Sequence, residues 1–311
     1  MNPGRLRVAL LSGGKSGERE VSLKSGNMVS KALDPMRYEV KHYDPSSDLE
    51  RLVRDSANLD VALIILHGRW GEDGTLQGLL DLLNLPYIGS GVMSSALCMD
   101  KRASKDLYRH NDLPTPRDLV VDRENRTRPD RIIQDLGLPV VVKPACEGSS
   151  LGVGIPRSQA ELESALDEAF ACGRWALVEE FLEGREITAS ILGNDQLTAL
   201  PLIEIIPGQD YNFFDYEAKY KPGASREICP APLSEELTRR GQDLGIKAHR
   251  ALYCRGFSRT DMILKNGSYY ILETNTIPGL TETSLYPQAA AAAGLSFDRL
   301  MDRLIELALE K

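Results

Sequence analysis

The chain has 311 residues, 42% of them hydrophobic and 26% charged, which predicts a globular protein with two or three domains and a large core. Its formal net charge of −8 argues against general binding to nucleic acids or to anionic membranes. The five cysteines show no CxxC spacing and make no zinc pattern with the four histidines, so we expect a reduced, cytoplasmic protein.

No apolar run approaches the roughly 18 residues that a membrane helix needs. Near the N-terminus only Val8 to Leu11 form such a run, which is too short for the core of a signal peptide. The sequence therefore predicts neither a membrane span nor a secretion signal.

A strand, a glycine loop and a helix follow one another at the start of the chain: Val8 to Leu11, Ser12 to Gly17, and about Glu18 to Leu33. This order is typical of an anion site at a helix N-terminus, although a simple tight turn is the alternative. A P-loop is excluded because that motif needs a glycine at the position of Ala9.

A second buried strand, Val61 to Leu66, ends at His67, and a helix is expected over Thr75 to Leu83. A short strand over Pro86 to Ile88 follows, and we place the first domain boundary near Cys98. This alternation predicts a doubly wound α/β domain. His67 lies where such domains place ligand contacts, but a structural hydrogen bond would equally account for it.

The middle of the chain alternates helices and strands around a glycine-rich segment. Ala145 to Gly154 follows a strand that ends at Lys143-Pro144, and it is either a loop over phosphates or an ordinary glycine-rich turn. The backbone of residues 179–182 could contact a purine edge. The other expected elements are the helices 102–110, 132–136, 159–171 and 234–252 and the strands 139–144, 175–181 and 185–192.

Pro207 to Arg226 is long, polar and rich in aromatic residues, which is typical of a lid, or else of a cluster packed on the core. Near the C-terminus, Ala289 to Ala293 is expected to be helical. An amphipathic helix capped by Ser296 should close the chain.

A hairpin is predicted where two strand-like runs flank Asn266-Gly267. Arg259 and Asp261 share one face of the first strand, and Glu273 and Asn275 share one face of the second. A two-residue turn would place Asp261 opposite Leu272, whereas a three-residue loop over 266–268 would pair it with Glu273. We predict the three-residue loop.

Two carboxylates opposed across a ladder repel each other unless a cation lies between them. The oxygens of Asp261, Glu273 and Asn275 suit Mg²⁺, which is commonly held by carboxylates together with substrate phosphates. Arg259 could neutralise charge on a transferring phosphoryl group. The alternative is an ordinary solvated strand face with mixed charges.

From about Arg5 to Leu307 the chain resembles the D-alanine:D-alanine ligases of the ATP-grasp superfamily. The segments that carry the resemblance are 17–22 (GEREVS), 67–68 (HG), 71–75 (GEDGT), 99–101 (MDK), 142–144 (VKP), 147–150 (EGSS), 215–220 (DYEAKY), 259–261 (RTD) and 273–279 (ETNTIPG). Their number and order make chance similarity negligible. The resemblance implies three α/β domains, 1–98, 99–179 and 180–311, the first with a parallel sheet and the other two clamping ATP.

The resemblance also implies an activity. One D-alanine would be phosphorylated by ATP to an acyl phosphate, and the amine of a second D-alanine would displace phosphate to give D-alanyl-D-alanine for peptidoglycan precursors. A carboxylate is a poor electrophile until it is phosphorylated, and phosphoryl transfer needs chiefly positioning and charge neutralisation. The alternatives are a ligase with another acceptor, D-serine or D-lactate, and a non-catalytic ATP-binding module.

Roles for individual residues follow from the resemblance. Asp261, Glu273 and Asn275 would hold two Mg²⁺ ions, with Mn²⁺ as a possible substitute. Lys101 and Lys143 would bind the ATP phosphates, Glu147 to Ser150 would fold over them, and Lys219 would contact the γ-phosphate. Glu179, Glu180 and Leu182 would line the adenine site, and Glu186 would bind the ribose. For the amino acids the residues are Glu18, Ser149 and Tyr220 at the first D-alanine, Ser284 at the second, Arg259 and the Gly279 N–H at the oxyanion, and His67 near both.

Trp70 and Cys146 occupy positions that vary in the family, and neither has a functional interpretation. Tyr220 is intact, which favours a D-amino acid over D-lactate as the second substrate. D-serine is harder to separate from D-alanine, because one hydroxyl in a small pocket changes little in the sequence. A homodimer is expected, since one formed by the N-terminal domains is common in the family.

Overall fold

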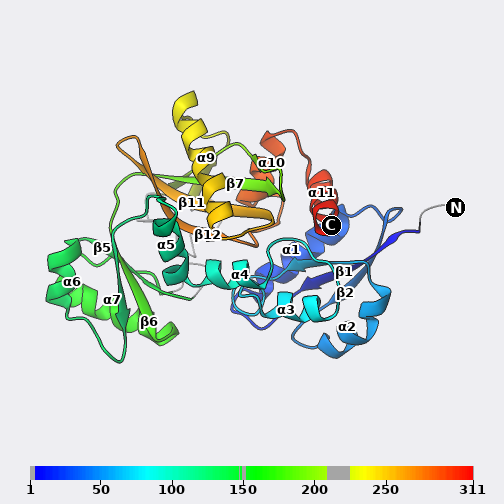
Figure 1. The fold of residues 1–311 in the computed structure, drawn as a ribbon, viewed down its shortest axis with the longest axis horizontal. Helices are drawn as coiled ribbons and strands as arrows, with labels where there is room; N and C mark the ends of the chain where they lie inside the picture. Colours follow the sequence, from blue (N-terminus) through cyan, green and yellow to red (C-terminus); the bar gives the residue numbers. More distant parts are fainter. Residues whose placement is uncertain (1–3, 147, 149–151, 209–224, 311) are drawn as a thin grey trace.

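The computed structural model describes residues 4–146, 148, 152–208 and 225–310, and their strands form three separate sheets. Figure 1 shows the N-terminal sheet at the right, the central sheet at the left and the C-terminal sheet between and above them. No helix in the described ranges is long and apolar enough to cross a membrane.

The N-terminal sheet is parallel, with strand order β2-β1-β3. Its strands are β1 (Leu6–Ser12), β2 (Tyr38–Tyr43) and β3 (Val61–Ile65), and its helices are α1 (Arg19–Ala32), α2 (Leu49–Asp55), α3 (Thr75–Leu82) and α4 (Val92–Met99), with a 3-10 turn at Ser56–Asn58. Every residue of β3 is buried, as expected for a parallel strand covered on both faces. The expected strand at 86–88 is only an isolated bridge between Tyr87 and Ala62.

The central sheet is antiparallel, with strand order β4-β6-β5. It consists of β4 (Asp118–Asp122), β5 (Val140–Pro144) and β6 (Trp175–Glu180), and helices α6 (Pro129–Leu136) and α7 (Gln159–Cys172) pack on it. Ser158 caps α7 by accepting the N–H of Glu161, so β5 and β6 are joined through a helix with a well-defined start.

The C-terminal sheet follows the order β10-β9-β7-β11-β12, with the short β8 paired to β7. Its elements are β7 (Arg185–Gly193), β8 (Thr198–Ala199), β9 (Ile203–Pro207), β10 (Ser225–Ile228), β11 (Gly256–Lys265) and β12 (Ser268–Asn275), with helices α5 (Lys101–His110), α9 (Glu235–Ala251), α10 (Leu285–Ala292) and α11 (Phe297–Leu309). Apolar residues of α5 and α9 pack on it, while α11 shares a core with β1 and β3. The last helix therefore packs on the first sheet, and Figure 1 shows α11 next to the N-terminal domain.

The β11–β12 hairpin has the predicted residue pairing, but its turn is shorter than predicted. Asp261 is opposite Glu273, and Arg259 is opposite Asn275, as predicted. The three-residue loop is wrong, because Lys265 pairs with Ser268 and only Asn266 and Gly267, both with positive φ, form the turn. A register shift between Asp261 and Met262 accommodates Leu272 as a β-bulge, which restores the pairing that the short turn alone would have lost.

Most expected helices and strands are confirmed, but several short ones were missed. The missed elements are β2, α2, α4, β4, β8, β9 and β10. Ser296 stands at the N-cap position of α11 as expected, yet its side chain makes no cap hydrogen bond and its hydroxyl donates to Asp298 instead.

Two helical glycines give a matched test of the packing beneath the site. A Cβ at Gly26 in α1 would lie 2.6 Å from both Cβ and Oγ of Ser12, so Gly26→Ala should lower the free energy of unfolding by about 1–3 kcal/mol. A Cβ at Gly78 in α3 would meet nothing closer than Val92 Cγ2 at 3.7 Å, so Gly78→Ala should be neutral or gain up to about 1 kcal/mol.

Urea unfolding of both variants and of the wild type checks this expectation. Equal stability of Gly26→Ala and the wild type would contradict the close contact between α1 and β1.

Candidate active site

A cavity of about 400 Å³ is lined by residues of the N-terminal domain, of α5, of the segment after β5 and of the C-terminal sheet. It brings together residues that the sequence analysis selected from distant parts of the chain. Those that line it are Glu18, His67, Lys101, Arg259, Glu273, Asn275, Gly279 and Ser284.

Arg259, which lines this cavity, forms a closed pair with Asp261 behind it. The guanidinium of Arg259 donates from Nε to Asp261 Oδ1 at 2.8 Å and from a terminal nitrogen to Oδ2 at 2.7 Å. Thr188 on the neighbouring strand β7 donates to Oδ1 at 2.7 Å. Both carboxylate oxygens of Asp261 therefore have donors, and Asp261 is not among the described residues that line the cavity.

Glu273 faces the cavity, with its side chain 33% exposed, and its Oε2 lies 3.4 Å from Nζ of Lys101. Lys101 is the first residue of α5, whose start is capped by Asp100 through the N–H groups of Arg102 and Ala103. The backbone N–H of Lys101 also donates to the carbonyl of Ala145 at 2.9 Å, which ties α5 to the end of β5. This side of the cavity thus combines a carboxylate with a positioned ammonium group.

The described residues include no group of three or more histidine, cysteine, aspartate or glutamate side chains that could hold a metal ion. The predicted metal ligands do not form such a group, because only two of them are carboxylates, Asp261 and Glu273, and the third is the amide of Asn275. Mg²⁺ needs few protein ligands, since it keeps waters and binds substrate phosphates. An all-oxygen set with Glu273 open to the cavity fits that preference.

His67 and Glu72 are buried, titratable residues of the cavity wall. Burial lowers the pKa of His67, which the charge of Glu18 partly offsets, and His67 Nε2 has no hydrogen-bond partner within the described part of the chain. Burial, together with the charge of Glu18, raises the pKa of Glu72 to about 8. Sequence reasoning gave Glu72 no role, although it lies in the quoted GEDGT segment and accepts the N–H of Gly68 at 2.5 Å.

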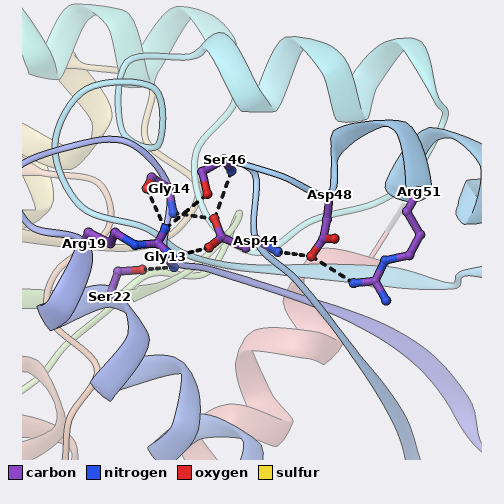
Figure 2. A network of polar contacts seen from close by, with 8 residues as sticks. All are labelled: Gly13, Gly14, Arg19, Ser22, Asp44, Ser46, Asp48 and Arg51. Atoms are coloured by element: carbon purple, nitrogen blue, oxygen red, sulfur yellow. Dashed lines mark hydrogen bonds and ion pairs between the residues drawn. The ribbon is translucent and has the colours of Figure 1, made fainter.

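The glycine loop after β1 is not an open anion site. Figure 2 shows Asp44 inserted beside it, where Asp44 Oδ1 accepts the N–H of Gly14 and of Ser46, each at 2.9 Å. Asp44 Oδ2 also lies 2.6 Å from Arg19 at the start of α1. The chain's own carboxylate thus accepts a backbone N–H of this loop, which favours the tight-turn alternative.

Glu18, next to this loop, stands at the N-cap position of α1 and is buried in the cavity wall. A Cβ at Gly148 would lie 3.4 Å from Glu18 Oε2, so the glycine-rich segment after β5 reaches the same place. Of the other residues predicted in that segment and in the lid, Glu147, Ser149, Ser150, Lys219 and Tyr220 lie outside the described residues.

Ser284 and Gly279 lie close together at the start of α10. A Cβ at Gly279 would be 2.9 Å from Ser284 Oγ, so only glycine fits without displacing the hydroxyl. Ser284 Oγ also lies 2.7 Å from the hydroxyl of Thr281 and accepts the N–H of Thr281 at 3.2 Å. A hydroxyl at a helix N-terminus is suited to receive a carboxylate.

Lys143 and the proposed adenine segment lie beside the cavity. Lys143 Nζ is 2.7 Å from Glu179 Oε2, so the side chain of Glu179 is held by lysine. The N–H groups of Glu180 and Phe181 donate to the carbonyls of Arg117 and Pro139. The carboxylate of Glu180 accepts from Arg117 as well, so it turns away from the proposed nucleotide. Glu186 lies in β7 opposite Ile263 of β11.

The lowered pKa of His67 gives a testable pH dependence. In the unfolded chain the imidazole takes up a proton below about pH 6.5, whereas in the folded chain it resists protonation. The free energy of unfolding that this group contributes is therefore complete above about pH 6.5 and declines as the pH falls below it. An NMR titration, assigned with His67→Gln, should show a midpoint below that of a free histidine.

In Glu18→Gln the midpoint should fall further, because a neighbouring negative charge is lost. A midpoint at or above about 6.5 in the wild type would contradict the burial of His67.

Comparison with known proteins agrees with this geometry. A family model described as the D-ala D-ala ligase C-terminus matches residues 107–306, and one described as the D-ala D-ala ligase N-terminus matches residues 41–90. A D-alanine–D-alanine ligase of Syntrophobacter fumaroxidans is 59% identical over 310 residues, covering 100% of both chains. The ligase of Desulfotalea psychrophila is 53% identical and covers 99% of this chain and 96% of its own.

Solved structures also match the chain over nearly its full length, at lower sequence identity. The D-alanine–D-alanine ligase of Bacillus anthracis complexed with ATP has a TM-score of 0.87 at 34% identity, covering 98% of this chain and 97% of its own. The VanG D-Ala:D-Ser ligase of Enterococcus faecalis has a TM-score of 0.85 at 30% identity, covering 98% and 100%. The chain therefore belongs to the D-alanine–D-alanine ligase family and has the ATP-grasp fold.

Proposed function

We propose that the protein joins two D-alanines to D-alanyl-D-alanine with hydrolysis of ATP to ADP, for peptidoglycan precursor synthesis. The observation that carries the proposal is the cavity itself, which gathers the nucleotide-side residues Lys101, Glu273 and Asn275 and the amino-acid-side residues Glu18 and Ser284. Relatives at up to 59% identity carry the name of this activity.

The metal set would be Glu273, Asn275 and Asp261, with Glu273 shared between two Mg²⁺ ions and Mn²⁺ as a possible substitute. When bound, the metal would neutralise phosphate charge during transfer. Because Arg259 holds both oxygens of Asp261, binding of a cation would require the guanidinium to give up part of this pair. That release would free Arg259 to face the developing oxyanion together with the N–H of Gly279.

The nucleotide would lie against the central sheet. Lys101 and Lys143 would bind its phosphates, with Glu147 and Ser150 folded over them and Lys219 brought in from the lid. Because the N–H groups of Glu180 and Phe181 already have partners, the purine edge would be met by the N–H of Leu182 and by carbonyls of residues 179–182. Glu186 would contact the ribose.

The first D-alanine would place its ammonium at Glu18, supported by Ser149 and Tyr220, and the second would place its carboxylate at Ser284. Both ligands would lie near His67, whose neutral imidazole at pH 7 can act as a hydrogen-bond partner without adding charge. We also propose that the protein is a cytoplasmic homodimer, which the family resemblance supports.

The decisive assay is dipeptide formation. Purified protein with ATP, Mg²⁺ and D-alanine should release phosphate and form D-alanyl-D-alanine detectable by mass spectrometry. Glu273→Ala should abolish turnover and Arg259→Ala should lower it on the order of 100-fold or more, because each removes charge stabilisation from the transferring groups. Glu236→Ala, which removes a carboxylate that is 72% exposed in α9, is the control and should leave the rate unchanged.

Absence of dipeptide from a folded, ATP-binding protein would contradict the proposal. Stronger phosphate release with D-serine or D-lactate than with D-alanine would favour the alternative acceptor instead. Near-normal rates in Glu273→Ala would remove the assigned role of that carboxylate. Unchanged function of Glu273→Ala in the cell would favour a non-catalytic ATP-binding module.

Chelation gives an independent check of the metal set. We expect EDTA to abolish phosphate release and added Mg²⁺ to restore it, because two opposed carboxylates need a cation to bring a triphosphate between them. Titration calorimetry of Mg²⁺ with a non-hydrolysable ATP analogue should show metal-dependent nucleotide binding that Glu273→Ala weakens. Full activity in EDTA would contradict the set.

A further inference from the structure

Lys105 is a fully buried lysine to which no function has been attached. Its side chain is 0% exposed, and its Nζ lies 2.5 Å from Oε1 of Glu179. The other carboxylate oxygen, Oε2 of Glu179, lies 2.7 Å from Nζ of Lys143. One buried carboxylate is thus shared between two ammonium groups.

The position of Lys105 links the two sheets that would enclose the nucleotide. It lies on α5, Glu179 lies on β6 of the central sheet, and Lys105 also donates to the carbonyl of Ile271 on β12 at 3.1 Å. Ile271 precedes Glu273 by two residues in that strand. The ammonium of Lys105 therefore contacts Glu179, the partner of the proposed phosphate ligand Lys143, and also β12, the strand that carries the proposed metal ligand Glu273.

The charges of this cluster do not cancel. Burial would raise the pKa of Glu179, but the two lysines outweigh that effect and the net shift is downward, so the carboxylate is ionised. Burial is the largest cause of the lowered pKa of Lys105, and the attraction of Glu179 offsets only part of that shift, so the positive charge of Lys105 is assigned from its 2.5 Å contact with Glu179. Asp118 pairs with Arg109, and its charge also acts to raise the pKa of both lysines.

Without Lys105 the cluster would be a single Lys143–Glu179 pair. Such a pair is electrically neutral, and it would hold Lys143 against Glu179 rather than against a phosphate. With Lys105 present, Glu179 is already neutralised from the other side, and the raised pKa of Lys143 keeps its positive charge. Counted over Lys105, Glu179 and Lys143, one unit of positive charge then remains.

We propose that Lys105 is a positioning residue for the nucleotide: it shares the charge of Glu179 and thereby leaves the Lys143 side of the cluster with net positive charge for a phosphate. The inference rests on the proposed use of ATP and adds a residue that touches neither nucleotide nor amino acid. Lys105 acts through Glu179 and Lys143. Its hydrogen bond to the carbonyl of Ile271 fixes the position of this cluster relative to β12.

The test separates charge from structure. Lys105→Gln keeps a donor for Glu179 but removes the positive charge, and its thermal midpoint shows whether it folds. Binding of Mg²⁺ with the non-hydrolysable analogue AMP-PNP should weaken roughly 10- to 100-fold, the range of one charged hydrogen bond. Binding of adenosine, which has no phosphate, should stay within about 3-fold of the wild type. The exposed Lys247→Met in α9 is the control and should change neither.

The double variant Lys105→Gln/Glu179→Gln restores the net charge of the cluster, so its AMP-PNP affinity should return to within about 3-fold of the wild type. This variant also serves if Lys105→Gln does not fold, because it removes the buried carboxylate that Lys105→Gln leaves with one ammonium group instead of two. Unchanged AMP-PNP affinity in Lys105→Gln, an equal loss for adenosine, or no recovery in the double variant would overturn the proposal. Failure of the wild type to bind AMP-PNP would instead contradict the proposed function.

Discussion

The active site depends on one unfavourable contact, the opposition of Asp261 and Glu273 across β11 and β12. Two carboxylates at paired positions of a sheet repel each other, so their placement needs compensating positive charge. Arg259 supplies it on the side of Asp261, and Lys101 lies near Glu273 on the other. A cation between them would replace part of this compensation.

The same design recurs beside the cavity. Glu179 lies between two lysines and Asp261 lies beside Arg259, so each of these buried acids is held by a base. At Glu179 the bases exceed the acid, which suits a region that must accept a highly charged triphosphate. Glu72, in contrast, forms no ion pair within the described ranges, and burial together with the charge of Glu18 raises its pKa more than the charge of Arg259 lowers it.

Much of this arrangement could be predicted from sequence. Period-two alternation placed Arg259 with Asp261 and Glu273 with Asn275, and the resemblance supplied the order of the motifs. The turn was wrong because a β-bulge at Leu272 is set by packing: Met262 and Ile271 must both face the core while Glu273 faces the cavity. Local sequence carries no signal for that requirement.

Other features depended on contacts between distant segments. Asp44 filling the glycine loop joins residues 30 positions apart, and Lys105 reaches Glu179 from another element. A lysine within a helix is expected to be exposed to solvent, so the sequence predicted neither the burial of Lys105 nor its contact with Glu179. Missed strands such as β8 and β10 are short and take their pairing from β7 and β9.

The central claim is that acidic and amide oxygens of β11 and β12 hold a divalent cation beneath the terminal phosphates of ATP. A crystal structure with Mn²⁺ and AMP-PNP, analysed by anomalous scattering, tests it most directly. The account predicts metal peaks about 2–2.3 Å from oxygens of Glu273 and Asn275, with at least one bridging to phosphate. Peaks elsewhere, or nucleotide bound with Glu273 free of metal, would contradict it.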